Sequence, residues 1–344
     1  MGSDVAIGID LGGTKLAAGV VDDGGRVSLL ERGPVGGRSY DAILDLISDT
    51  VTRLGDRAAA HGQDVVAVGV ATAAFLDADR DIVRHAPNLA WRERPFRADL
   101  RHRLGLPVIV ENDADAAAWG EYAHGAGRGE RCLVLATVGT GLGGGIVVSG
   151  AMFRGGSGLG AEFGHFGIVP GGRPCRCGAR GCLEQYASGT ALASAARAES
   201  ARDSRLLRRA GGDPERIDGP LVVALARDGD PAARGAVEEV GGWLGRGLAQ
   251  VAAVVDPSLV LVGGGLAEVG DLLLAPTRAA FETSLSLRTV RPASPVRAAA
   301  LGNLAGVVGA AALARAAGPD ATSAVRDLAG AAHAGSDDRR RTCA

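Results

Sequence analysis

Residues 5–21 read VAIGIDLGGTKLAAGVV. Two short apolar runs bounded by turn residues predict two buried strands, with a tight turn between Asp10 and Leu16. The glycines of this turn let backbone N–H groups approach an anion closely, and Thr14 and Lys15 add a hydroxyl donor and a positive charge. Asp10 ends a buried strand, where a carboxylate needs partners, so we interpret the turn as a phosphate-binding loop rather than an ordinary hairpin.

The second half of the chain repeats this arrangement. Residues 132–149 read CLVLATVGTGLGGGIVVS, in which strands predicted over 132–138 and 145–149 flank a glycine loop. The loop contains the spacing G-x-G-x-x-G, but a dinucleotide site needs a helix after the glycines. The β-branched residues that follow predict a strand instead. We therefore expect a second phosphate loop of the strand–turn–strand kind, and two related α/β lobes with a cleft between them.

A third motif, Glu111-Asn112-Asp113, follows an apolar strand predicted over 108–110 and opens a helix predicted over 114–124. Aspartate at this place is commonly a helix N-cap. The carboxyl end of a strand in an open α/β sheet is also where ligands bind. Both roles are compatible with the sequence at this point.

A cluster of metal-ligand residues comes next, spaced H-x9-C-x-C-x4-C. It consists of His165, Cys175, Cys177 and Cys182. Three thiols and one imidazole form a closed tetrahedral set for structural zinc. Reduced thiols or a disulfide are the alternatives, but the glycine-rich loop favours ligation, and no secretory signal precedes the chain.

Two glutamates, Glu162 and Glu184, bracket this cluster. A carboxylate can accept hydrogen bonds from two neighbouring hydroxyls of a sugar ring. A solvated salt-bridging role is the alternative. Because the predicted metal would pin the segment between them, we favour a polyol-binding site.

Length and composition narrow the function classes. The 344 residues suggest two domains, and the net charge of −2 gives no reason to expect nucleic acid or an anionic membrane as a partner. No apolar run is long enough to span a membrane, and we expect a cytoplasmic protein. The segment 318–344 is rich in Ala, Asp and Arg, and it is predicted to be disordered and dispensable.

These motifs together resemble the ROK family of sugar kinases and repressors. The segments that carry the resemblance are DLGGTK, ENDADAAAWGE, TVGTGLGGG, GAEFGH and CRCGARGCLEQYASG. The match spans about residues 5–314, and the cysteine segment is its most specific part. Within the family, the chain is most similar to bacterial ATP-dependent glucokinases. It departs from the usual pattern at Ala73-Ala74, where the family commonly has a pair ending in glycine.

The resemblance implies a two-lobed actin-like ATPase fold, also called ribonuclease H-like. The small lobe is expected over 1–113, with a C-terminal helix at about 303–316 packing back on it. The large lobe is expected over 114–302, with the zinc-binding loop at 165–182. A homodimer or homotetramer is expected.

The implied reaction is phosphorylation of glucose to glucose 6-phosphate by Mg-ATP, with Asp113 as the general base. Asp10 would orient the magnesium. The expected sugar contacts are Asn88, Asn112, Asp113, Glu162, His165 and Glu184. The expected nucleotide contacts are Asp10, Gly12, Gly13, Thr14, Lys15, Thr137, Gly139, Thr140, Gly141, Gly143, Gly144, Gly263, Gly264 and Gly265.

Three rival functions remain at this level. One is a kinase for another hexose, namely N-acetylmannosamine, N-acetylglucosamine or fructose. Another is a glucokinase that uses polyphosphate. The third is a sugar-sensing ROK regulator, which we disfavour because only nine residues precede Asp10 and the sequence shows no basic patch.

Overall fold

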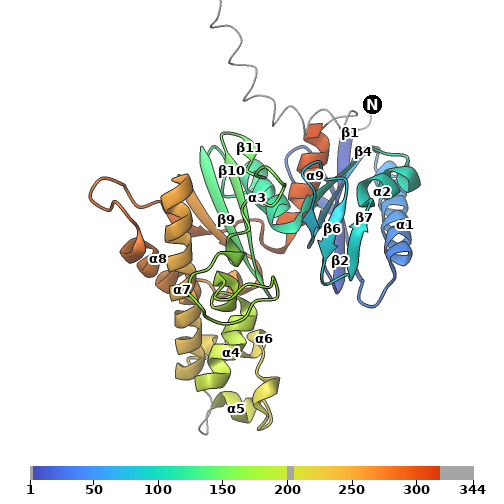
Figure 1. The fold of residues 1–344 in the computed structure, drawn as a ribbon. Helices are drawn as coiled ribbons and strands as arrows, with labels where there is room; N and C mark the ends of the chain where they lie inside the picture. Colours follow the sequence, from blue (N-terminus) through green and yellow to red (C-terminus); the bar gives the residue numbers. More distant parts are fainter. Residues whose placement is uncertain (1–2, 200–204, 318–344) are drawn as a thin grey trace, which may run out of the picture. The chain divides into compact units, whose positions relative to one another are not determined.

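The computed structural model describes residues 3–199 and 205–317. The described chain forms two compact units (Figure 1). Of the described residues, unit 1 comprises 3–124, 151–160 and 304–317. Unit 2 comprises Gly125–Gly150 and Ala161–Asn303. The predicted disordered tail, 318–344, lies outside the described residues.

Unit 1 is built on a five-stranded mixed sheet in the order β3-β2-β1-β4-β8. Its strands are β1 (Ser3–Leu11), β2 (Lys15–Val21), β3 (Val27–Pro34), β4 (Gln63–Thr72) and β8 (Val108–Asn112). The pairs β1–β2 and β2–β3 are antiparallel, whereas β1–β4 and β4–β8 are parallel.

The alternation of side chains along β1 explains how this sheet is covered. Ile7 and Ile9 share a buried cluster with the apolar side of helix α1 (Tyr40–Ala59). The intervening Gly8 faces helix α9 (Ala305–Ala317), where an added Cβ would lie 1.9 Å from the carbonyl oxygen of Val307. Successive residues of a strand point to opposite faces, so α1 and α9 cover opposite sides of the sheet.

Helix α3 (Asp113–His124) packs on α9 by an equally close approach. Gly120 and Gly309 leave no room for side chains between the two helices. Unit 1 also holds a small sheet and one further helix. They are β5 (Phe75–Leu76), β6 (Val83–Ala86), β7 (Trp91–Arg94) and α2 (Phe96–Leu104).

The second five-stranded sheet has the order β11-β10-β9-β12-β13. Its strands are β9 (Cys132–Val138), β10 (Leu142–Val148), β11 (Ala151–Met152), β12 (Leu259–Gly263) and β13 (Val296–Ala298). As in the first sheet, an antiparallel pair, β9–β10, is followed by two parallel pairs, β9–β12 and β12–β13. This repeated strand order confirms the predicted α/β fold of the two-lobed actin-like, ribonuclease H-like class.

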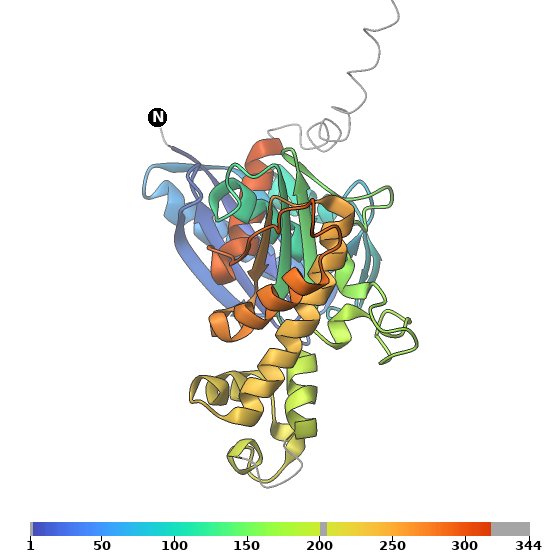
Figure 2. The same cartoon turned by 90° about the vertical axis from the view of Figure 1, so that its left-hand side faces the viewer.

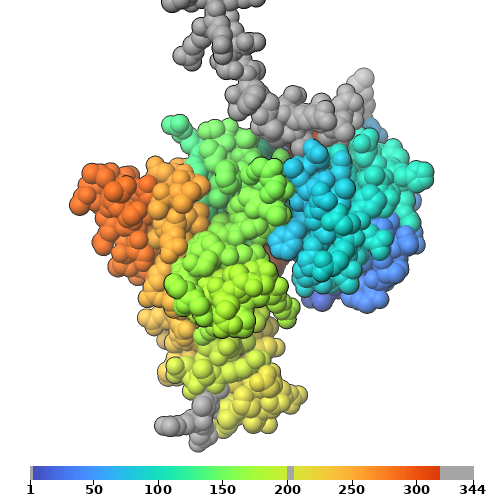
Figure 3. Space-filling view, viewed as in Figure 1, coloured from blue at the N-terminus to red at the C-terminus, as the bar shows by residue number. Residues whose placement is uncertain are grey.

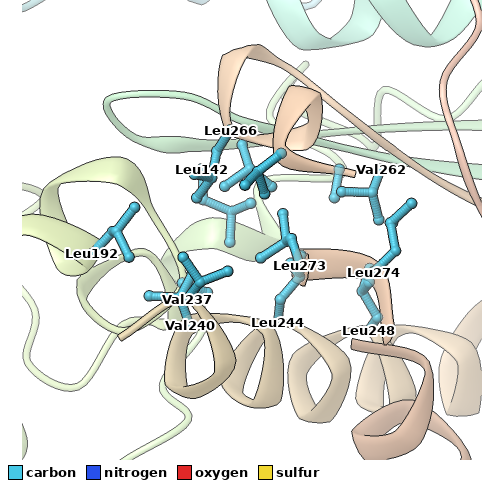
Figure 4. Packing of buried hydrophobic residues seen from close by; sticks show 14 of the residues in the cluster. Leu142, Leu192, Val237, Val240, Leu244, Leu248, Val262, Leu266, Leu273 and Leu274 are labelled. Carbon is cyan, nitrogen blue, oxygen red and sulfur yellow. The ribbon is translucent and has the colours of Figure 1, made fainter. Parts of the chain in front are cut away.

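Helices complete unit 2, and Figure 2 shows α4, α5 and α6 gathered beside one end of the long α7. Their bounds are α4 (Gly189–Glu199), α5 (Arg205–Arg209), α6 (Gly219–Arg227), α7 (Pro231–Val255) and α8 (Asp271–Ser284). The core of the unit lies where α7 and α8 meet the sheet. Figure 4 shows Leu244 and Leu248 of α7 close to Leu273 and Leu274 of α8, with Val262 of β12 nearby.

The two units differ from the predicted lobes at one boundary and one insertion. Helix α3 belongs to unit 1, although the small lobe was predicted to end at residue 113. The physical reason is the glycine contact with α9, which the local sequence of α3 does not reveal. The segment Ala151–Gly160 also belongs to unit 1, although it was assigned to the large lobe.

Candidate functional site

The carboxyl ends of the parallel strands in unit 1 bring the predicted catalytic residues to one edge of the sheet. Asp10 lies opposite Ala71 of β4, and Thr72, the next residue of that strand, lies opposite Asn112 of β8. Asp113 follows Asn112 and begins α3. Ligands of open α/β sheets bind at this edge.

Two carboxylates at this edge have perturbed acidity. Burial and, to a smaller extent, repulsion from Asp113 together raise the pKa of Asp10 to about 7. Burial also raises the pKa of Asp113, although hydrogen bonds from backbone N–H groups, Ala114 first, oppose the shift. A raised carboxylate pKa suits a general base that works near neutral pH. A bound divalent cation would stabilise the ionised form of the buried Asp10 carboxyl.

Asp10→Asn is therefore expected to raise the melting temperature by a few degrees at pH 8 without added magnesium. Above about pH 7, Asp10 is ionised in both the folded and the unfolded chain. Because the charge is buried only in the folded chain, it destabilises the folded state there, and the neutral asparagine does not. Near pH 4 the Asp10 carboxyl is protonated in the folded state, so the difference in melting temperature between variant and parent is smaller. Thermal melts of parent and variant at the two pH values test this; a variant that is less stable at pH 8 would contradict it.

The predicted phosphate turn of unit 1 is a tight loop between β1 and β2. The Gly12 N–H donates to the carbonyl oxygen of Lys15 at 3.0 Å. Gly13 lies against Asn88, since an added Cβ at Gly13 would come within 2.6 Å of the Asn88 Cβ. Thr14 and Lys15 are exposed. The structure thus brings the phosphate turn and the predicted sugar contact Asn88 together.

Asn112 proves to be the cap of α3. Its Oδ1 accepts from the N–H groups of Ala114 and Asp115 at 2.8 and 3.1 Å, and its Nδ2 donates to the Ala74 carbonyl oxygen at 3.3 Å. Ala74 is buried and does not have a positive φ. Ala74, one of the two alanines at which the sequence departs from the family pattern, therefore causes no backbone strain. Its carbonyl oxygen helps to orient the Asn112 side chain.

The glycine loop of unit 2 is shorter than predicted. Strand β10 begins at Leu142 rather than at residue 145, so the turn is confined to Gly139–Gly141. Gly143 and Gly144 lie in the strand opposite Thr137 and Ala136. An added Cβ at Gly144 would meet the Phe163 ring at 2.3 Å. The glycine run extends past the loop into β10 because Gly144 must leave space for the Phe163 ring.

The loop Gly139–Gly141 is fixed by its neighbours within unit 2. The Gly189 N–H donates to the Gly139 carbonyl oxygen at 2.7 Å, and the Thr190 hydroxyl donates to that of Thr140 at 2.7 Å. Gly263 pairs with Thr137, and an added Cβ at Gly264 would lie 2.6 Å from the carbonyl oxygen of Val138. Gly265 follows, opening a short 3-10 helix. These glycines therefore lie beside the loop, as a shared nucleotide site requires.

The four predicted metal ligands converge in unit 2. The atoms that His165, Cys175, Cys177 and Cys182 offer lie within 4.8 Å of one another. The Cys175 Sγ is 3.6 Å from the His165 Nδ1, and the Sγ atoms of Cys177 and Cys182 are 3.6 Å apart. Tetrahedral zinc with ordinary bond lengths would give edges of about 3.5–3.8 Å. The described cysteines, 132 included, form no disulfide, so this arrangement can hold a metal ion.

The most buried thiol of this cluster, that of Cys182, is less acidic than a free thiol. Burial, followed by hydrogen bonds from neighbouring thiols, raises the pKa of Cys182 to about 12. A protonated thiol is a poor metal ligand, whereas a metal ion stabilises the thiolate. The loop that carries the cysteines is mostly exposed and lies within the green to yellow-green surface in Figure 3.

Both predicted acids lie within three residues of a predicted metal ligand in the sequence. Glu162 precedes the 3-10 helix Phe163–His165, and its carbonyl oxygen accepts from the His165 N–H at 3.0 Å. Glu184 lies in the 3-10 helix Leu183–Gln185, which begins after Cys182. One Glu184 oxygen accepts from the Leu142 N–H at 3.1 Å. Two short helices at the cluster therefore each have an acid, Glu162 just before one and Glu184 within the other, and Glu184 links its helix to the glycine loop.

The sequence analysis did not identify two arginines that contact the Glu111-Asn112-Asp113 segment. Arg80 and Arg154 both form ion pairs with the buried carboxylate of Glu111. The one signal in the sequence is Glu111 itself, a carboxylate at the end of an apolar strand that must have a cationic partner. Which arginine supplies the charge depends on tertiary contacts.

Comparison with known proteins identifies the family. The ROK family profile matches residues 6–317. A glucokinase from Streptomyces coelicolor is 45% identical over 315 residues, covering 90% of this chain and 98% of that protein. The crystal structure of a ROK family glucokinase from Streptomyces griseus, in complex with glucose and AMPPNP, is 44% identical, with a TM-score of 0.82 and coverage of 90% of this chain and 99% of that one. A ROK hexokinase from Thermus thermophilus is 35% identical, with a TM-score of 0.72 and coverage of 90% and 98%. The chain belongs to the ROK family.

Proposed function

We propose that this protein is a glucokinase, which transfers the terminal phosphoryl group of ATP to the 6-hydroxyl of glucose. The observation that carries this proposal is the match over nine-tenths of the chain to a glucokinase solved with glucose and an ATP analogue. The site chemistry of the chain agrees with it, since unit 1 places Asp10, Asn112 and Asp113 at the ligand-binding edge of its sheet.

Asp113 is the proposed general base. As the sugar oxygen attacks the terminal phosphorus, the Asp113 carboxylate takes the hydroxyl proton, and the bond to the bridging oxygen breaks to release ADP. The raised pKa of Asp113 makes it a stronger base than an ordinary aspartate. Bound magnesium would neutralise charge on the phosphates, with Asp10 as the residue that orients it.

Substrate contacts are divided by type. The sugar hydroxyls are bound by Asn88, Asn112, Asp113, Glu162, His165 and Glu184. The backbone of the turns at 12–15 and 139–141 binds phosphate oxygens, because its N–H groups approach an anion without a side chain in the way. The segment 263–265 contacts the adenosine. Glucose is favoured over N-acetyl hexoses because a site built for a hydroxyl rejects an analogue that lacks it.

A structural zinc ion completes the proposed site. His165, Cys175, Cys177 and Cys182 would hold it, and the 3.6 Å separations of their atoms fit the edges of its coordination shell. The ion would keep the Glu162 and Glu184 helices in place. Because Nδ1 of His165 faces the thiols, Nε2 is the nitrogen assigned to a sugar hydroxyl.

ADP release measured over a panel of sugars tests the proposed function. Glucose is expected to give the highest kcat/KM among glucose, mannose, fructose, N-acetylglucosamine and N-acetylmannosamine, with ATP preferred over polyphosphate. If an N-acetyl sugar gave the higher value, the protein would be a kinase for that sugar instead. Turnover with no sugar would contradict the kinase assignment altogether.

The cellular context is proposed on the same basis. We expect a homodimer or homotetramer in the cytoplasm, with no nucleic-acid partner. No helix within the described ranges is long and apolar enough to cross a membrane. Light scattering during gel filtration distinguishes the two oligomers from a monomer.

A further inference from the structure

Three buried charged side chains of unit 1, Arg80, Glu111 and Asp115, form one connected network with the partly buried Arg154 beside the proposed base. The Glu111 carboxylate is fully buried, and each of its oxygens is paired with a different arginine. Its Oε1 lies 2.7 Å from the Arg80 Nε, and its Oε2 lies 2.6 Å from the Arg154 Nη2. Arg80 continues to Asp115, whose Oδ2 is 3.2 Å from the Arg80 Nη2. Two cations and two anions therefore neutralise one another in a largely buried network.

The two acids of the network lie on either side of Asp113. The junction is the point where β8 ends at Asn112 and α3 begins at Asp113. Glu111 is the second-last residue of β8, and Asp115 lies in the first turn of α3. Arg80 contacts both, so one guanidinium spans the strand–helix junction that presents Asp113. The Glu111 Oε1 also accepts from the Asn112 N–H at 3.0 Å. The network thus includes a hydrogen bond to the backbone of the junction as well as contacts between side chains.

Both arginines are themselves held rigidly. Arg80 has a φ of 59° and is 2% exposed, and its Nη1 donates to the Gly158 carbonyl oxygen at 2.7 Å. Arg154 approaches Glu111 with two nitrogens, since its Nε is also 2.9 Å from Oε2. Both Arg154 and Gly158 belong to the segment Ala151–Gly160, which returns to unit 1. A planar guanidinium that is fixed in this way imposes a direction as well as a charge.

We propose that Arg80 and Arg154 are positioning residues, which hold the Glu111–Asp115 junction so that Asp113 is aimed at the reacting hydroxyl. This inference rests on the proposed function of Asp113. A buried ion-pair network contributes little net stability compared with apolar packing of the same volume, but its geometry is specific. A base displaced by about 1 Å can lose about 10²-fold in rate.

Arg154→Gln is the central test, with Arg291→Gln as its matched control. Arg291 is a similarly shielded arginine in unit 2, 16% exposed at the side chain against 13% for Arg154, and it pairs with Asp256. Arg154→Gln should lower kcat by about 10–10²-fold, with the glucose dissociation constant, from calorimetry, within a few-fold of the parent value. Arg154→Lys should recover part of the rate, and Arg291→Gln should keep it.

The pH profile separates positioning from a charge effect. Because burial is the main cause of the raised pKa of Asp113, kcat should fall at all pH values with an unchanged midpoint. If Arg154→Gln does not fold, the double variant Glu111→Gln with Arg154→Gln replaces the ion pair by neutral amides and serves in its place. It too should keep glucose binding and lose kcat.

Two results would overturn the inference while leaving the proposed function intact. One is a folded Arg154→Gln, or folded double variant, with the kcat of Arg291→Gln. The other is a loss of kcat that is fully explained by loss of glucose binding. A parent protein that phosphorylates no sugar would overturn the proposed function and this inference together, so the parent rate is measured first.

Discussion

Asp113→Asn is expected to lower kcat by about 10²–10⁴-fold, the usual contribution of general-base catalysis. The amide cannot accept the hydroxyl proton, but it keeps the size of the carboxylate and can still accept a hydrogen bond. Glucose should therefore still bind. Steady-state kinetics and calorimetry with glucose on the same preparations measure the two effects separately.

Asp99→Asn is the matched control for this variant. Asp99 is another half-buried aspartate of unit 1, and it accepts a hydrogen bond from the Tyr40 hydroxyl at 2.6 Å, a bond that asparagine can preserve. Its replacement should leave kcat near the parent value. An Asp113→Asn variant whose kcat stays within a few-fold of the parent would remove Asp113 from the mechanism.

Cys182→Ser is expected to abolish metal binding and to weaken glucose binding by about 10²-fold. Cys182 is fully buried and immediately precedes the helix that carries Glu184. The metal would add to the backbone hydrogen bond from the Leu183 N–H to the Phe166 carbonyl oxygen, which otherwise joins that helix to the one ending at His165. Elemental analysis should find one zinc per parent chain, purified without chelator, and almost none in the variant.

Cys132→Ser provides the control for the loss of a thiol. Cys132 is also buried in unit 2, but its Sγ donates to the Val255 carbonyl oxygen at 3.4 Å, and a serine hydroxyl can do the same. This variant should retain both metal and glucose affinity. Parent protein that contains no zinc, or a Cys182→Ser variant with the parent glucose affinity, would refute the structural role of the metal.

The sequence was sufficient for those parts of the fold that local patterns determine. Apolar runs bounded by turn residues located β1, β2, β8 and β9, and the helix predicted over 114–124 corresponds to α3. The ligand spacing of the cysteine segment located the metal cluster, because its four members lie within 18 residues of one another. Such features depend on short stretches of chain.

The parts that the sequence did not reveal depend on distant contacts. The start of β10 was placed three residues late, because a run of glycines has no side chains to show the alternation of a strand. No element was predicted over 75–104 or 189–227, where the structure has a small sheet and several helices. The Glu111 network joins residues 31 and 43 positions apart, and α3 was misassigned because its partner α9 lies at the other end of the described chain.

The most direct test of the account is identification of the product formed from ATP and glucose. The protein is expected to yield glucose 6-phosphate and ADP in equal amounts, as measured by phosphorus NMR and a glucose 6-phosphate dehydrogenase assay, and Asp113→Asn should form almost none. ADP release without a phosphorylated sugar, a phosphate at another hydroxyl, or equal product from Asp113→Asn would contradict the account.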